Sequence, residues 1–276
     1  MIRSLFIASS GMQAQQLNLD VISNNLANVN TTGFKKSRVD FQSLFYQSLQ
    51  KPVASTEGGQ SRFGVEVGTG VKVAATKTIF NNGILEQTGN DLDLAIEGRG
   101  FFMVHLPNGE VGFTRGGSFR LDGEGYLVNP DGCRVMSTQG NVSPEKSVSL
   151  EGKELKYLKP DTESLTVNIA PNGTITTEKE ISGPPVLELA YFTNPGGLEA
   201  IGSTTYAANA ACGKTLVGQA ATENFGVIRS SFLEESNVQI VDEMVKMIMA
   251  QRAYEIGSKA IQTSDDMMGI TNNLKR

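Results

Sequence analysis

Apolar side chains near the N-terminus recur with a period of seven residues. The repeat consists of Leu5, Met12, Leu19 and Leu26, and a second row three residues further on includes Ile22. Such a period is typical of a helix whose apolar stripe faces another helix. Residues 1–30 contain no proline and only one glycine, so the pattern predicts a long N-terminal helix.

The C-terminus carries a second stripe with the same period. Its members are Ile240, Met247, Tyr254, Ile261 and Met268, and small residues follow three positions later at Ala250, Gly257 and Ser264. Each stripe alone fits the core face of an ordinary helix. Two stripes at opposite ends favour terminal helices packed as an antiparallel coiled coil. Since such a pair has only a narrow apolar seam, we expect partner molecules to cover its remaining apolar side chains.

The segment after the first helix changes character twice. Asparagines and a glycine predict a helix end near Asn28–Asn30 and a tight turn at Gly33. A shorter amphipathic stretch follows, through Phe41, Leu44, Phe45 and Leu49. Residues 51–62 then lose all periodicity, which predicts a loop or an extended arm.

The middle of the chain alternates with a period of two, which is typical of strands. The alternation begins at Val65, Val67, Val71 and Val73, and continues at residues 92–96, 164–169, 173–178 and 186–193. Asn108-Gly109, between residues 101–106 and 110–115, predicts a hairpin. The expected fold class is α+β, with an antiparallel β-rich domain between the two helices.

These patterns predict three parts of the chain. Residues 1–33 and 238–276 form a terminal helical domain, residues 34–70 and 225–237 a connecting region, and residues 71–224 the β-rich domain.

Composition excludes several classes of function. The net charge is -5, and lysine and arginine are scattered, which argues against a nucleic-acid binder. One histidine and two separated cysteines make a zinc site improbable. Buried free thiols at Cys133 and Cys212 are favoured over a disulfide. No stretch approaches the ~20 apolar residues of a membrane span, and the apolar run at residues 5–8 is too short for a cleaved signal peptide.

Fragments that look like catalytic motifs fail on inspection. Gly213-Lys214-Thr215 resembles a phosphate-binding loop, but Ala208 stands where that loop needs glycine. His105 is the one candidate general base, and no nucleophile lies near it in sequence. We therefore expect no catalytic residue, no cofactor and no metal. An enzyme or binding module built on the β-rich domain is the less favoured alternative.

Two terminal motifs carry a resemblance to a known family. The N-terminal motif consists of Asn24, Asn25, Leu26, Ala27, Asn28, Gly33 and Phe34, and the C-terminal motif of Gln251, Arg252, Ala253, Tyr254 and Glu255. With these motifs the whole chain resembles bacterial flagellar rod and hook proteins. In this family a segment inserted after the first helix marks the distal rod and stiffens it. Here it spans about 46–63 and includes Tyr46, Pro52, Gly58, Gly59 and Phe63.

The resemblance implies a structural subunit of the distal rod that transmits torque, with proximal rod or hook protein as the alternatives. Its terminal helices are expected to line an inner tube, with the β-rich domain outside. The implied partners are further copies of the chain, proximal rod proteins, the hook protein, the flagellar export apparatus and, in a Gram-negative cell, the outer-membrane and peptidoglycan rings. The implied location is the basal body, across the periplasm, reached without a cleaved signal peptide.

The chain departs from the family pattern at two places. Gly257 stands where the family commonly has asparagine, and glycine inside a helix costs up to ~1 kcal/mol relative to alanine. The helix is therefore either looser or more tightly packed there. The segment from Val142 to Pro160 is longer than expected and predicts an enlarged outer loop.

Overall fold

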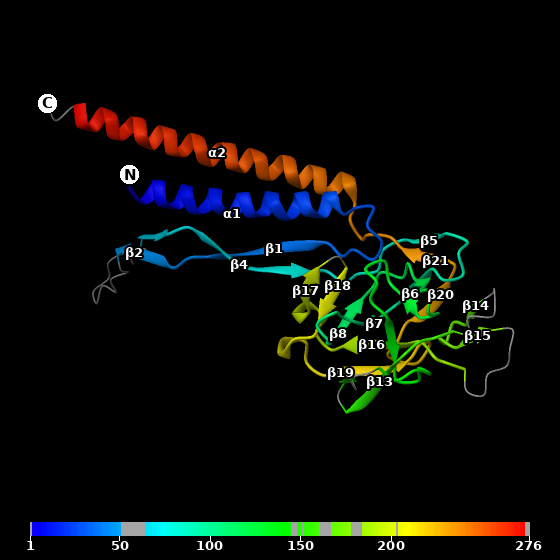
Figure 1. Cartoon of the computed structure of the whole chain (residues 1–276). Helices are drawn as coiled ribbons and strands as arrows, with labels where there is room; N and C mark the ends of the chain where they lie inside the picture. The colour runs from blue at the N-terminus through cyan, green and yellow to red at the C-terminus, as the bar shows by residue number, and fades with distance from the viewer. Residues whose placement is uncertain are drawn as a thin grey trace, which may run out of the picture. The chain divides into compact units, whose positions relative to one another are not determined.

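The computed structural model describes residues 2–50, 65–144, 148–150, 152–160, 167–177, 184–202 and 204–273. Within them the chain is α+β, with a helix at each end and β structure between (Figure 1), which confirms the expected class. It divides into two compact units. The helical unit comprises Met1–Ala27, Ser37–Thr78 and Gln239–Arg276, and the β unit comprises Asn28–Lys36 and Ile79–Val238.

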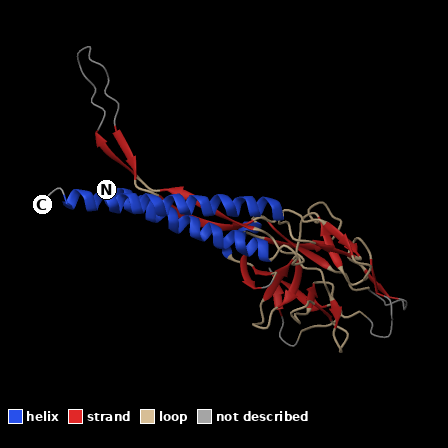
Figure 2. Ribbon diagram, turned by 90° about the horizontal axis from the view of Figure 1, so that it is seen from above, coloured by secondary structure: helices blue, strands red, loops and turns tan. Residues whose placement is uncertain are grey.

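Two long helices dominate the helical unit. They are α1 (Ile2–Ala27) and α2 (Ile240–Asn273), which lie side by side in both views (Figures 1 and 2). Asp242 and Glu243 stand in the first turn of α2, where negative charge complements the helix dipole. α1 ends at Ala27, and Gly33 has a φ of 72°. The predicted helix end and turn are therefore confirmed.

Four strands complete the helical unit. They are β1 (Ser37–Ser43), β2 (Tyr46–Gln50), β3 (Val65–Gly68) and β4 (Val71–Thr78). β1 pairs antiparallel with β4, and β2 pairs antiparallel with β3. The amphipathic stretch through Phe41, Leu44 and Phe45 therefore contains strands, because these distant partners fix its conformation. Its last member, Leu49, lies in β2.

The units are bounded differently from the domains expected from the sequence. Residues 34–70 were expected to be a connecting region, and residues 71–224 a separate β-rich domain. In the structure β4 pairs along its whole length with β1. Residues 37–78 therefore group with the helices, and the β unit resumes at Ile79.

The β unit is built around a seven-stranded sheet with the order β12-β13-β11-β7-β8-β18-β17. These strands are β12 (Val148–Leu150), β13 (Lys153–Tyr157), β11 (Val135–Ser137), β7 (Phe102–His105), β8 (Val111–Thr114), β18 (Thr205–Ala207) and β17 (Glu199–Gly202). β12 and β13 occupy the segment expected as an enlarged loop. All pairings within the described strands are antiparallel, as predicted.

Shorter pairs flank this sheet. They are β5 (Leu85–Gln87) with β21 (Phe232–Glu234), β6 (Leu94–Glu97) with β20 (Val227–Ser230), β9 (Arg120–Leu121) with β10 (Leu127–Val128), β14 (Val167–Ile169) with β15 (Ile175–Thr177), and β16 (Glu188–Phe192) with β19 (Thr215–Gln219). Two short 3-10 helices, Pro195–Gly197 and Ala210–Cys212, complete the described elements. The predicted hairpin at Asn108-Gly109 is confirmed as β7–β8.

The core of the β unit lies on both faces of the sheet. Phe102 and Val104 point to one apolar cluster, whereas Met103 points to the other. This is the two-residue alternation expected of a strand buried on both sides. In the described part of the helical unit, the buried apolar residues are only Ala14, Ile22, Val39 and Ala250.

Candidate functional site

A row of small residues on α2 faces α1. Ala250 and Ser264 are buried, and Gly257 stands midway between them. A Cβ placed on Gly257 would lie 2.7 Å from Cγ of Met12, and the hydroxyl oxygens of Ser4 and Ser264 are 3.4 Å apart. The small side chains therefore allow the two helices to approach closely. Of the two possibilities left open for Gly257, the structure shows tight packing.

The larger stripe residues predicted to form the assembly surface flank this row. Ile22 is buried; the partly buried members are Leu5, Met12, Leu19, Leu26, Met247, Ile261 and Met268. Ile240 and Tyr254 are exposed by 48% and 40%. The two helices alone therefore leave part of the predicted stripe in water.

The start of α2 also carries an exposed apolar face on its other side. It consists of Val241, Met244, Val245, Ile248 and Met249, each of which is at least 50% exposed. Single exposed apolar residues are common on protein surfaces, but contiguous patches of them mark interaction sites. We call this set the outer face of α2.

Asn25 of the N-terminal motif clamps three elements of the helical unit together. Its side chain donates to the carbonyl of Ser37 and accepts from the Ser37 amide, both at 2.9 Å. It also donates to Glu243 at 3.2 Å. Glu243 in turn pairs with Lys246 at 2.6 Å. Because Asn25 and Glu243 are each only 2% exposed, these polar groups need each other as partners.

Gly33 of the same motif lies in a crowded part of the β unit. Its φ of 72° favours glycine, and a Cβ there would lie 2.4 Å from the amide nitrogen of Gly116. The Gly33 amide donates to the carbonyl of Glu234 at 2.7 Å. The motif glycine therefore joins the segment after α1 to the strand β21 before α2.

A buried ionic cluster forms beside this contact. Lys35 pairs with Glu234 at 2.5 Å, and Arg115 pairs with the same carboxylate at 3.3 Å. Lys35 also donates to the carbonyl of Asn81, and Gly83 donates its amide to Glu234. Lys35, Glu234 and Arg115 are at most 3% exposed. The cluster fixes residues from four distant parts of the sequence.

Burial governs the electrostatics of the cluster. Removal from water lowers the pKa of Lys35 from its ordinary value, and Glu234 partly opposes that shift. Burial likewise lowers the pKa of Arg115, against the attraction of Glu234. Two cations share one carboxylate, so removing Glu234 would leave both buried and unpaired.

The remaining motif residues are exposed or half-buried. Gln251, Arg252 and Glu255 are exposed, and Arg252 pairs with Glu255 at 3.1 Å. Ala253 is half-buried. The other members of the N-terminal motif are Asn24 and Ala27, which are exposed, and Asn28 and Phe34, which are half-buried.

The rod-specific segment is described only at its start. Tyr46 opens β2 and is 64% exposed. Pro52, Gly58, Gly59 and Phe63 lie outside the described residues.

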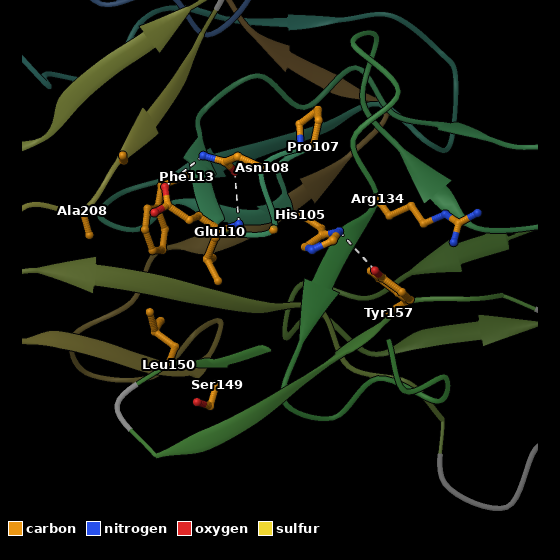
Figure 3. Close-up of a pocket in the computed structure, with 13 residues that line it drawn as sticks. His105, Pro107, Asn108, Glu110, Phe113, Arg134, Ser149, Leu150, Tyr157 and Ala208 are labelled. Atoms are coloured by element: carbon orange, nitrogen blue, oxygen red, sulfur yellow. Dashed lines mark hydrogen bonds between the residues drawn. The ribbon is translucent and has the colours of Figure 1, made fainter. Parts of the chain in front are cut away.

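His105 lines a cleft of about 970 Å³ on the β unit (Figure 3). Its Nδ1 lies 3.1 Å from the hydroxyl of Tyr157, and the two side chains point toward each other. Burial lowers the pKa of His105, and Arg134 lowers it further. The environment is that of a packed, hydrogen-bonded histidine. Within the described residues, no cluster of three or more His, Cys, Asp or Glu could hold a metal.

Two further features concern the cysteines and the helices. Cys133 and Cys212 are buried free thiols, as favoured. Neither described helix combines the length and the apolarity that crossing a bilayer requires.

Sequence patterns did not single out several of these residues. They are Lys35, Arg115, Glu234 and Glu243. Glu234 lies 199 residues from Lys35 in the chain. Local periodicity does not link charged residues that lie so far apart in the sequence.

Comparisons with known proteins match all three regions of the chain. The family model for the flagella basal body rod protein matches residues 5–35. The D1 domain of the flagellar hook protein FlgE/F/G matches residues 95–177, and the C-terminal region of the flagellar basal body rod FlgEFG protein matches residues 229–274.

Curated rod proteins are similar to the chain over its full length. The chain is 43% identical to the flagellar basal-body rod protein FlgG of Borreliella burgdorferi, over 100% of both chains. It is 36% identical to FlgG of Caulobacter vibrioides, over 99% of this chain and 100% of the relative. The flagellar hook protein FlgE of Treponema pallidum is 48% identical, over 49% of this chain and 29% of its own.

Proposed function

Because the chain belongs to the family of flagellar basal-body rod proteins, we propose that it is the subunit of the distal rod, which polymerises helically into a stiff shaft and transmits torque from motor to hook. The family is structural, and the chain is a rod component of the basal body rather than an enzyme. It assembles with other rod and hook proteins.

The outer face of α2 is the observation that carries this proposal. Ile248 at its centre is 55% exposed, and each of its four apolar neighbours is at least 50% exposed. Burial of apolar surface is the main force of protein association. α2 packs on α1 through small residues, and its larger apolar residues are exposed to solvent. Such a helix is suited to packing between copies.

The packing of α1 on α2 supports the finer structural proposal. Ser4 near the start of α1 meets Ser264 near the end of α2, and Asn25 near the end of α1 meets Glu243 near the start of α2. The contacts fit an antiparallel coiled coil whose seam is the small-residue row. In the polymer, Leu5, Met12 and Ile261 would then complete the seam, with the exposed stripe residues covered by neighbouring copies.

The proposed mode of association is heterologous. In a helical polymer, a face of one copy packs on a different face of the next. Such heterologous contacts generate open helical filaments when the rotation does not close a ring. We propose that the terminal helices line the inner tube and that the β unit forms the outer layer, with residues 1–33 and 238–276 as the tube-forming ends.

The length of the alignments favours the distal rod over the hook. The rod relative aligns over 281 residues, whereas the hook relative aligns over 137. The segment of about 46–63 supports the same choice, as the part that stiffens the shaft. Proximal rod proteins, the hook protein, the envelope rings and the export apparatus are the proposed partners, and the periplasm-spanning position and export without a cleaved signal peptide are proposed with them.

A charge on the outer face of α2 tests the proposal. We expect the purified chain to sediment as a polymer that electron micrographs show as straight rods. Ile248→Glu should raise the concentration needed for assembly at least about tenfold, a loss typical of a central interface residue. Circular dichroism of the β unit should be unchanged. Ile84→Glu, at a 73% exposed position of the β unit, is the matched control.

Deletion of residues 51–62 tests the distal-rod assignment separately. Curved polymers from the deleted chain support the stiffening role. Straight rods after deletion would instead assign the chain to another part of the axial structure. A chain that stays monomeric without any substitution refutes the proposal altogether.

A further inference from the structure

An aromatic cavity of about 330 Å³ lies in the β unit beside the start of β7 and the end of β16. Phe80, Phe101, Tyr191 and Phe192 line it. The ring centroids of Phe80 and Phe101 are 5.3 Å apart in an edge-to-face arrangement, and those of Phe101 and Phe192 are 5.7 Å apart. Walls of this kind accept one more aromatic ring in the same geometry.

An arginine at the rim adds to this preference. Arg99 lines the cavity and is exposed, and within the described residues its side chain takes part in no hydrogen bond or ion pair. A guanidinium beside an aromatic cavity stacks on the face of an entering ring. The chain already uses this contact elsewhere, since Arg134 lies 4.2 Å from the ring centroid of Tyr126.

A highly exposed aromatic side chain lies on the helical unit. Phe45 lies at the corner between β1 and β2 and is 92% exposed. The corner is held by hydrogen bonds from the Leu44 amide to Gly70 at 2.9 Å and from the Thr69 hydroxyl to the Phe45 carbonyl at 2.6 Å. The backbone is therefore fixed in a form that presents the ring to solvent.

We propose that Phe45 of one copy inserts into the Phe80–Phe101–Tyr191 cavity of a second copy, where Arg99 covers the ring. This inference rests on the proposed function, because it requires copies to meet. It adds a contact between a β1–β2 corner and a β unit to the packing of the terminal helices. A projection on one part of the chain and a cavity on another make the contact heterologous, which suits a helical polymer.

Three other exposed apolar residues are less suited to the cavity. Phe6 and Tyr254 belong to the terminal helices, whose surfaces the proposed seam already uses. Ile84 is 73% exposed but offers no π face to Arg99. Among the large apolar residues that the structure describes, Phe45 is the most exposed, and it has the ring that the cavity and Arg99 favour.

Disulfide trapping between copies tests the contact directly. Chains with Phe45→Cys and chains with Thr193→Cys, at the exposed rim of the cavity, are mixed, assembled and oxidised. The native cysteines are buried. We expect a cross-linked dimer on a non-reducing gel, because the two Cβ atoms come within disulfide reach. Ile84→Cys in place of Phe45→Cys is the control that should give none.

The outcomes separate this inference from the proposed function. The proposed contact is refuted if polymers form without the cross-link. It is also refuted if a double variant cross-links only within one chain. In both cases the proposed polymerisation is unaffected. Absence of any polymer from the unsubstituted chain overturns both. Phe45→Ala should raise the concentration needed for assembly about tenfold, as expected for an anchor side chain. Arg99→Gln should raise it by a smaller factor. An unchanged assembly concentration for Phe45→Ala contradicts the inference.

Discussion

The two units bury their apolar residues to very different extents. In the β unit Phe102, Phe113 and Leu187 are wholly enclosed, and both faces of the seven-stranded sheet are covered. In the helical unit α2 runs for 34 residues, yet its buried residues are Glu243, Ala250 and Ser264, two polar and one small. The β unit therefore contains its own core, whereas the helical unit contains only a narrow seam.

This difference indicates where each unit finds its stability. Most helical stability in proteins comes from packing of an apolar face rather than from propensity. The described faces of α2 are packed on one side only. The β unit is accordingly expected to fold alone, and the helical unit to be completed by other copies. Substitutions in one unit at a time test this difference.

The largest effect is expected from the ionic cluster of the β unit. Glu234→Ala leaves Lys35 and Arg115 buried without their carboxylate, and breaking a buried pair in this way costs about 3–5 kcal/mol. Denaturant unfolding of the β unit, followed by circular dichroism, measures the change. Glu97→Ala is the matched control, because its pair with Arg229 is more than half exposed, and its loss should cost about 0–1 kcal/mol.

Equal losses for the two variants would refute the role of the cluster. If instead Glu234→Ala prevented polymerisation with the β unit intact, the cluster would serve the helical unit, and the division into a self-sufficient and a dependent unit would fail.

Local patterns in the sequence predicted those parts of the fold that local chemistry determines. Asn108-Gly109 requires a turn, so the β7–β8 hairpin was predictable. The glycine-poor ends required helices. Phe41 was harder to place, because its strand conformation depends on pairing with β4. Periodicity carries no information about such partners.

The candidate site also has parts that local sequence predicts and parts that it does not. The small residues Ala250, Gly257 and Ser264 were visible as a row, and the structure shows this row against α1. The clamp at Asn25 and Glu243 was not predictable, because its partners are 218 residues apart. Motif resemblance identified Asn25 as important but did not give its hydrogen bonds.

An intermediate effect is expected from two glycines of α2. Gly257→Ala forces the new methyl against Met12, and overpacking of this kind costs about 1–3 kcal/mol. Gly269→Ala meets no atom within 4 Å, and it should stabilise the helix by about 0.5–1 kcal/mol relative to glycine. The thermal loss of helical signal in the assembled polymer compares the two variants. Equal stabilisation by both would mean that the helices do not approach closely at Gly257.

The smallest effect is expected from His105, and it concerns the β unit alone. The folded pKa lies below the ordinary value of 6.5, so the unfolded chain takes up the proton first as the pH falls. Stability is therefore present above pH 6.5 and is lost as the pH falls toward the folded pKa. In His105→Gln this loss is absent. The denaturant midpoint of the β unit should then fall less between about pH 7.5 and about pH 5.5 than in the unsubstituted chain.

Measuring the effect of His105→Gln on stability in both monomer and polymer tests whether the β unit is independent of assembly. His105 and its partner Tyr157 both belong to the β unit. If that unit is self-sufficient, the difference between His105→Gln and the unsubstituted chain is the same before and after assembly. A difference that appears only in the polymer would mean that the cleft around His105 is closed by a neighbouring copy, and that the β unit also depends on assembly.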